Sequence, residues 1–78
     1  MIINENGRIE KVGAILMLSG YFVLEPEQFL RVTKDGHLEL WEGKEDYLKS
    51  KSYNKCKRIG YWQLDHIVAL VETQHYLQ

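Results

Sequence analysis

Cys56 and the histidines His37, His66 and His75 are the side chains of this sequence best suited to bind a metal ion or to act as a nucleophile. Metal ligands that share a local segment usually recur at Cys-x-x-Cys or His-x-x-x-His spacing. No pair in this sequence has either spacing, and His66 and His75 are nine residues apart. We therefore expect solvent-exposed or capping histidines, and we expect neither a metal ion nor another cofactor.

Cys56 stands among three basic neighbours, at positions 55, 57 and 58, whose charge can lower a thiol pKa and make the thiol reactive. A catalytic thiol also needs a base and an oxyanion site, and the sequence has no glycine-rich loop or elbow to provide them. Asp65 and His66 could form an acid–base pair, but adjacent residues point to opposite faces of a strand. The sequence therefore predicts a chain that is not an enzyme and has no catalytic residue.

Charge is unevenly distributed along the chain. Residues 47–64 carry five basic and no acidic side chains, whereas residues 1–46 carry five basic and nine acidic ones. Aromatic residues alternate with the basic ones, a combination that suits interfaces with acidic proteins or with nucleic acids. A solvated basic loop and a surface for anionic lipid are the other interpretations. The candidate contact residues are Trp41, Tyr47, Lys49, Lys51, Tyr53, Lys55, Lys57, Arg58, Tyr61 and Trp62.

Acidic side chains gather in the preceding segment, at Glu25, Glu27, Glu39 and Glu42. Together with Trp41 they form a candidate negative surface for a basic partner, such as a nucleic-acid-binding protein whose site it would occupy. A solvated rim is the simpler alternative. The sequence leaves open whether the basic or the acidic face is used.

Length and composition indicate a single domain over residues 1–78, in which 45% of the residues are hydrophobic. A net charge of −1 argues against a role dominated by phosphate binding, and a single cysteine excludes an internal disulfide. The longest apolar stretch, residues 12–24, is interrupted and too short to span a bilayer. We expect a cytoplasmic protein without a membrane span. Because a domain of this size buries only about 60% of its unfolded surface, homo-oligomers are one way for it to gain stability.

Two turn signals organise the strands. Asp35 and Gly36 suit a three-residue hairpin loop with the glycine in the left-handed region, and residues 4–8 share this pattern. With that loop, residues 30 and 32 face residues 40 and 38, which gives an apolar face of four aliphatic side chains. A helix over residues 25–35, with Pro26 in its first turn, is the competing interpretation. We favour the hairpin.

The remaining elements follow from apolar periodicity. Residues 8–18 and 21–24 predict two strands or one bent strand, and residues 44–51 predict a short helix or a helical loop. Residues 57–64 predict a strand that sends Tyr61 and Trp62 to opposite faces. Residues 66–72 favour a strand over a helix capped by Asp65, because β-branched residues dominate the segment. The predicted fold is α+β, a small antiparallel sheet of four to five strands with one or two short helices.

Residues 29–49 resemble the second and third strands of a pleckstrin-homology domain and the loop beyond them, and residues 60–72 resemble its following strand and turn. The resemblance implies a β-rich binding module. The later strands and closing helix of that family have no room before Gln78, and the basic lipid-binding motif is replaced by Glu25 and Glu27. The resemblance thus implies at most a half-domain in a larger assembly and transfers no lipid-binding residue.

These features predict a small protein-binding module that regulates or inhibits a larger protein. Phage and mobile-element inhibitors of host systems are one candidate class of this size and composition. A nucleic-acid-binding protein that uses residues 47–62 is the main alternative.

Overall fold

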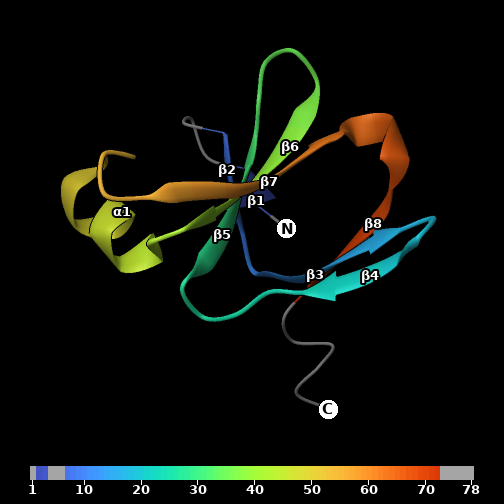
Figure 1. Cartoon of the computed structure of the whole chain (residues 1–78), viewed down its shortest axis with the longest axis horizontal. Helices are drawn as coiled ribbons and strands as arrows, with labels where there is room; N and C mark the ends of the chain where they lie inside the picture. Colours follow the sequence, from blue (N-terminus) through green and yellow to red (C-terminus); the bar gives the residue numbers. More distant parts are fainter. Residues whose placement is uncertain (1, 4–6, 73–78) are drawn as a thin grey trace.

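Figure 1 shows a small β structure with the helix α1 at one end; this computed structural model describes residues 2–3 and 7–72. Among these residues, no helix has the length and apolarity to cross a bilayer. In chain order, the elements are β1 (Ile2–Ile3), β2 (Arg8–Glu10), β3 (Val12–Met17), β4 (Gly20–Val23), β5 (Gln28–Val32), β6 (His37–Glu42), α1 (Lys44–Ser50), β7 (Lys57–Gln63), the 3₁₀-helix η1 (Leu64–His66) and β8 (Ile67–Glu72).

The strands form two antiparallel sheets, one with the order β1-β2-β5-β6-β7 and one with the order β4-β3-β8. The chain passes between the sheets three times: at Lys11, which separates β2 from β3, at residues 24–27, which join β4 to β5, and at η1, which separates β7 from β8 (Figure 1). Lys11 has a φ of 63°, a left-handed conformation that interrupts the extended chain. The antiparallel α+β prediction is confirmed. The predicted single sheet is replaced by two, because the left-handed Lys11 divides residues 8–18 between them.

β5 and β6 form the hairpin that the Asp35–Gly36 turn predicts. Leu30 pairs with Leu40 and Arg31 with Glu39, in the predicted register. Gly36 has a φ of 86°, which a residue with a side chain rarely adopts. The competing helix over residues 25–35 is wrong. β5 pairs with β6 on one edge and with β2 on the other, so tertiary pairing outweighs the local helix-start signal at Pro26.

The main core lies between the two sheets. Leu30, Leu38 and Leu40 from the hairpin meet Ile9 of β2 and Ile15 of β3, and all five are buried. The aliphatic face predicted for the hairpin is thus confirmed, with Val32 partly buried at its margin. These side chains fill the core because β2 and β3 lie in different sheets and bring Ile9 and Ile15 to it from two directions.

A second cluster forms on the opposite face of the five-stranded sheet, where α1 packs. The ring of Tyr47 lies 5.2 Å from that of Phe29 and 4.8 Å from that of Tyr53, measured between centroids. Trp41 completes the cluster at 4.6 Å from Tyr53. α1 ends at Ser50, and Lys51 caps it in a left-handed backbone conformation with its N–H donating to the carbonyl of Tyr47. These aromatic contacts hold the predicted helix of residues 44–51 on the sheet.

The later elements also match their predictions closely. The strands expected over residues 57–64 and 66–72 are β7 and β8, and Asp65 lies in η1 instead of starting a long helix. Trp62 packs against the main core and Tyr61 is exposed on the other face, as alternation predicts. The repeated turn signal of residues 4–8 falls partly on residues 4–6, which lie outside the described residues; its flanks pair Ile3 with Ile9.

The core predicts a large cost for truncating one of its leucines. Leu40→Ala should lower the free energy of unfolding by about 2–5 kcal/mol, because it leaves a cavity at a buried position. Leu48→Ala is the matched control, since Leu48 is exposed on α1 and should change stability by about 0.5 kcal/mol or less. Urea unfolding followed by circular dichroism measures both. Equal losses in the two variants would contradict the core described above.

Candidate protein-contact site

A buried carboxylate organises the outer face of the five-stranded sheet. Glu39, only 5% exposed, accepts hydrogen bonds from three side chains on three strands. Arg31 donates to Oε1 and Arg58 to Oε2, each at 2.9 Å, and the indole N–H of Trp41 donates to Oε1 at 3.1 Å. This set fixes two guanidinium groups and one indole on the same face. We call the outer face formed by Arg31, His37, Glu39, Trp41, Arg58 and Tyr61 the arginine face.

The ionisation of Glu39 is set by opposing effects. Burial alone would raise the pKa of its carboxyl group. The hydrogen bonds from Trp41, Arg31 and Arg58, with the charge of Arg31, outweigh burial and hold the pKa below its ordinary value. Glu39 is therefore ionised at neutral pH, and its charge is matched by the two arginines that flank it.

Three planar side chains stack beside this carboxylate. The guanidinium carbon of Arg58 lies 4.6 Å from the ring centroid of Tyr61, and the imidazole of His37 lies 4.5 Å from the same ring at an interplanar angle of 12°. Tyr61 and the side chain of Arg58 are 47% and 48% exposed. Glu39 and Tyr61 are cross-strand partners, so the stack lies directly next to the buried carboxylate. The result is an exposed aromatic and cationic surface with a fixed geometry.

The aromatic residues predicted for contact differ in how exposed they are in the structure. Tyr47 is 2% exposed inside the aromatic cluster under α1, so its assignment to the contact surface is corrected: packing against Phe29 withdraws the ring from solvent. Trp62 packs toward the main core, and Trp41 and Tyr53 are half-buried. Tyr61 is the predicted aromatic residue that the structure leaves most open.

The predicted basic residues do not form one patch. Lys49 is exposed on α1 and pairs with Glu45 at 3.3 Å, which brings an acidic side chain from outside the basic segment into it. Lys51 caps the helix, and Lys55 and Lys57 are exposed. The segment is basic along the sequence, but helical spacing places Glu45 next to Lys49 in space. Arg58 is the predicted basic residue that joins the arginine face.

The candidate acidic surface loses its central member. Glu39 is buried and paired with arginines, so it cannot present charge to a basic partner. Glu25, Glu27 and Glu42 remain exposed, and Glu42 lies opposite Lys57 in the sheet register. The cause is the hairpin register, which turns Glu39 toward Arg31 on the neighbouring strand.

Cys56 sits in a protected environment. Its Sγ lies 3.3 Å from the carbonyl oxygen of Gly43, toward which the thiol donates. Burial, followed by the charge of Asp46, raises the pKa of the Cys56 thiol. The basic sequence neighbours therefore do not activate it. Over residues 2–3 and 7–72, no three His, Cys, Asp or Glu side chains gather in a group that could hold a metal ion; His75 lies outside these ranges.

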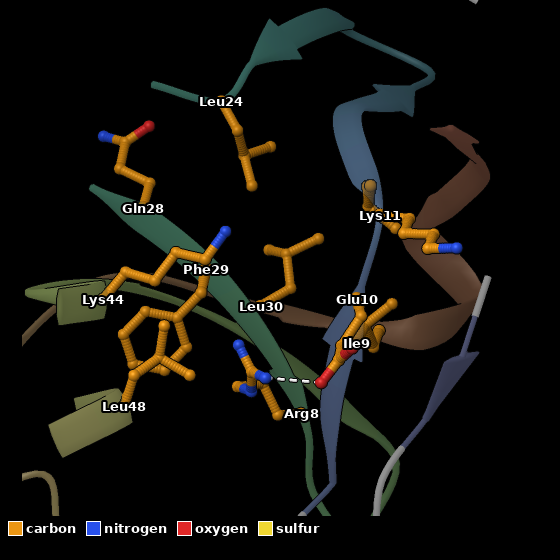
Figure 2. Close-up of a pocket in the computed structure, with 11 residues that line it drawn as sticks. Arg8, Ile9, Glu10, Lys11, Leu24, Gln28, Phe29, Leu30, Lys44 and Leu48 are labelled. Atoms are coloured by element: carbon orange, nitrogen blue, oxygen red, sulfur yellow. Dashed lines mark hydrogen bonds and ion pairs between the residues drawn. The ribbon is translucent and has the colours of Figure 1, made fainter. Parts of the chain in front are cut away.

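A pocket of about 360 Å³ opens between β2, β5 and α1 (Figure 2). Leu24, Phe29 and Leu30 line its apolar side, and Lys44 extends across it. An ion pair between Arg8 and Glu10 borders the other side. The arrangement can take an apolar group that carries a negative charge. Because Arg8 and Glu10 already pair with each other, the pocket offers a ligand less unpaired charge than its lining residues indicate.

Comparison of this chain with protein-family models, with curated proteins and with solved structures gave no match. The resemblance to pleckstrin-homology domains therefore remains a prediction. The contact site rests on the geometry of the arginine face alone.

Three members of the arginine face, Arg31, His37 and Glu39, lie outside the contact residues that the sequence predicts. The sequence predicts Glu39 in an acidic surface and His37 as a solvent-exposed or capping histidine, and Arg31 precedes the basic segment of residues 47–64. The hairpin register, which places Glu39 opposite Arg31, is the sequence signal that identifies Glu39 as a partner of an arginine. No local sequence signal identifies the stacking of His37, because its ring partner Tyr61 belongs to a strand 24 residues later.

Removing the charge of Glu39 should destabilise the fold in a pH-dependent way. Glu39→Gln should lower the free energy of unfolding at pH 7 by about 1–3 kcal/mol; partial exposure of both arginines favours the lower end. Because the folded pKa of Glu39 is depressed, this contribution is present above the ordinary value of 4.5 and lost as pH falls through the folded value. The wild-type and variant stabilities should therefore converge in acid.

Urea unfolding over an acid pH series measures this convergence. Glu42→Gln is the matched control, because Glu42 is an exposed glutamate on the same strand. An equal loss in both variants, or a gap that does not narrow in acid, would contradict the role of Glu39.

Cys56 should be a slow nucleophile in the folded chain. The midpoint of its pH–rate profile for alkylation by iodoacetamide should lie above that of the urea-unfolded chain, because the folded thiol has a raised pKa. Cys56→Ser should retain the fold and partner binding. A midpoint below that of the unfolded chain would instead identify an activated thiol.

Proposed function

We propose that this chain is a small, non-catalytic protein-binding module that regulates or inhibits a larger protein. The observation that carries the proposal is the arginine face, on which Glu39 holds Arg31, Arg58 and Trp41 and the rings of Tyr61 and His37 stack beside them. Arginine, tyrosine and tryptophan are the residues enriched at the energetic centres of protein interfaces.

Pre-organisation supports this role. A long side chain such as arginine loses rotamer entropy when a partner immobilises it, at a cost of about 0.5–1.5 kcal/mol per side chain. Arg58 is already held by Glu39 on one side and by the ring of Tyr61 on the other. The rotamer entropy of Arg58 is therefore largely lost when the chain folds, and a partner that binds this side chain does not have to order it again.

Charge defines the kind of partner. Arg31 and Arg58 bring two positive charges to the face, Glu39 brings one buried negative charge, and Asp35 brings an exposed carboxylate 3.2 Å from Nδ1 of His37. The cationic part of the face is therefore the exposed guanidinium of Arg58 beside the ring of Tyr61. A partner with an acidic group beside an apolar surface fits, since it can meet Arg58 and the ring of Tyr61 together. An acidic protein surface is the partner class we propose.

Nucleic acid is the alternative partner, because bases stack on aromatic rings next to cationic side chains. The stacked Tyr61 and Arg58 on an exposed sheet favour this alternative. The pairing of Lys49 with Glu45 weighs against it, since it reduces the continuous positive charge that a phosphate backbone needs.

Affinity capture from a lysate of the native host, with and without nuclease, tests the proposal and identifies the partner. Against that partner, Tyr61→Ala should raise Kd about 30-fold, mainly through faster dissociation. Arg58→Glu should slow association and change its salt dependence. Leu48→Ala and Lys49→Glu are the matched controls on α1, where Leu48 and Lys49 are exposed, and should leave Kd unchanged.

Normal affinity in both arginine-face variants, with the fold retained, would place the contact elsewhere. Capture that is lost on nuclease treatment, with affinity falling linearly in the logarithm of salt concentration, would replace the protein partner by nucleic acid.

A further inference from the structure

The outer face of the three-stranded sheet is apolar and open. Ile15 points inward and is fully buried, whereas Leu16, next to it on β3, points the other way and is 39% exposed; Ala14, on the same side as Leu16, is only 4% exposed. Leu16 pairs with Tyr21 of β4 and with Ala69 of β8, and Ala14 pairs with Val23 and Val71. We call the exposed residues of this set, extended by Val68 and by Leu18 at the β3–β4 turn, the apolar face.

The exposure of this face is too large for isolated surface residues. Leu18, Tyr21, Val68, Val23 and Leu16 are 89%, 70%, 55%, 49% and 39% exposed. For side chains of these sizes, that leaves on the order of 500 Å² of apolar surface on β3, β4, β8 and the β3–β4 turn. A patch of this size is comparable to the largest apolar patch of a typical monomer, which is often a functional surface.

We propose that the apolar face is a self-association surface, covered by the same face of a second copy of this chain. Glu72, at the end of β8, is the only charged residue in β3, β4 and β8. Two copies related by a two-fold axis therefore bring uncharged positions against uncharged positions, without like-charge repulsion. The other sheet offers no such match, because its outer face would set Arg31 and Arg58 against their own copies.

The area agrees with this occupant. A stable protein interface buries about 800 Å² on each partner, and homodimer interfaces are about 65% apolar. An apolar centre on the order of 500 Å² with a polar rim matches both values. Two antiparallel sheets also pack well face to face, at a separation of about 10 Å.

The apolar face and the arginine face lie on different sheets. The apolar face belongs to the β4-β3-β8 sheet, and the arginine face belongs to β5, β6 and β7 of the other sheet (Figure 1). Self-association through the first leaves the second open. The dimer would thus present two arginine faces, and it can form whether or not the proposed partner exists.

Sedimentation equilibrium of the full chain, from about 1 to about 500 µM, tests the inference directly. We expect a reversible monomer–dimer equilibrium in this range. Tyr21→Lys should weaken dimerisation at least 30-fold, because it sets two cations against an apolar surface. Tyr61→Lys, the same change at an exposed tyrosine on the arginine face, should leave dimerisation unchanged. Circular dichroism verifies that both variants are folded.

A charge-swap mixture shows whether the face meets itself. Leu16 lies on the central strand, near the place where a two-fold axis would pass. Leu16→Glu and Leu16→Lys should each be monomeric alone, and an equimolar mixture should recover a dimer. A wild-type chain that stays monomeric over the whole range overturns the proposal. A dimer that persists in Tyr21→Lys overturns it as well, because the contact must then lie elsewhere.

Discussion

The pairing of β5 with β6 is the constraint on which the rest of this structure depends. One three-residue loop, closed by the left-handed Gly36, fixes which residues of the two strands face each other. The same register sends Leu30, Leu38 and Leu40 inward to the core and turns Arg31 and Glu39 outward together. A shift by one residue would bury the charged pair and expose the leucines. The core and the arginine face therefore have a common origin.

Lys11 is the second constraint. Its left-handed backbone lets β2 and β3 belong to different sheets, although they are separated by one residue only. The two sheets then enclose the main core, and each keeps one outer face. α1 covers part of one outer face through Tyr47, whereas the outer face of β4-β3-β8 keeps its exposed apolar side chains.

The two open faces differ in the physics of binding. On the arginine face, buried Glu39 lies under an exposed cationic and aromatic stack, which favours an oriented contact with a complementary partner. The apolar face lacks directional groups over most of its area, so it suits a surface of the same composition. We infer from this difference that partner binding and self-association use separate sides of the chain.

The sequence alone favoured the hairpin over a helix of residues 25–35, and it fixed the register of that hairpin through local turn chemistry and alternation across a loop of three residues. It also predicted α1 and β7 to within about a residue and favoured β8 over a helix capped by Asp65. It could not determine that residues 8–18 divide between two sheets, because that break depends on the conformation of Lys11 alone. Nor could it separate buried Tyr47 from exposed Tyr61, since the difference arises only when α1 packs against Phe29. The tertiary structure decided the arginine face, because Glu39, Arg58 and His37 meet through pairing between strands that are distant in sequence. Local patterns specify which way a side chain points, and only the packing of the sheets and the helix specifies what it meets.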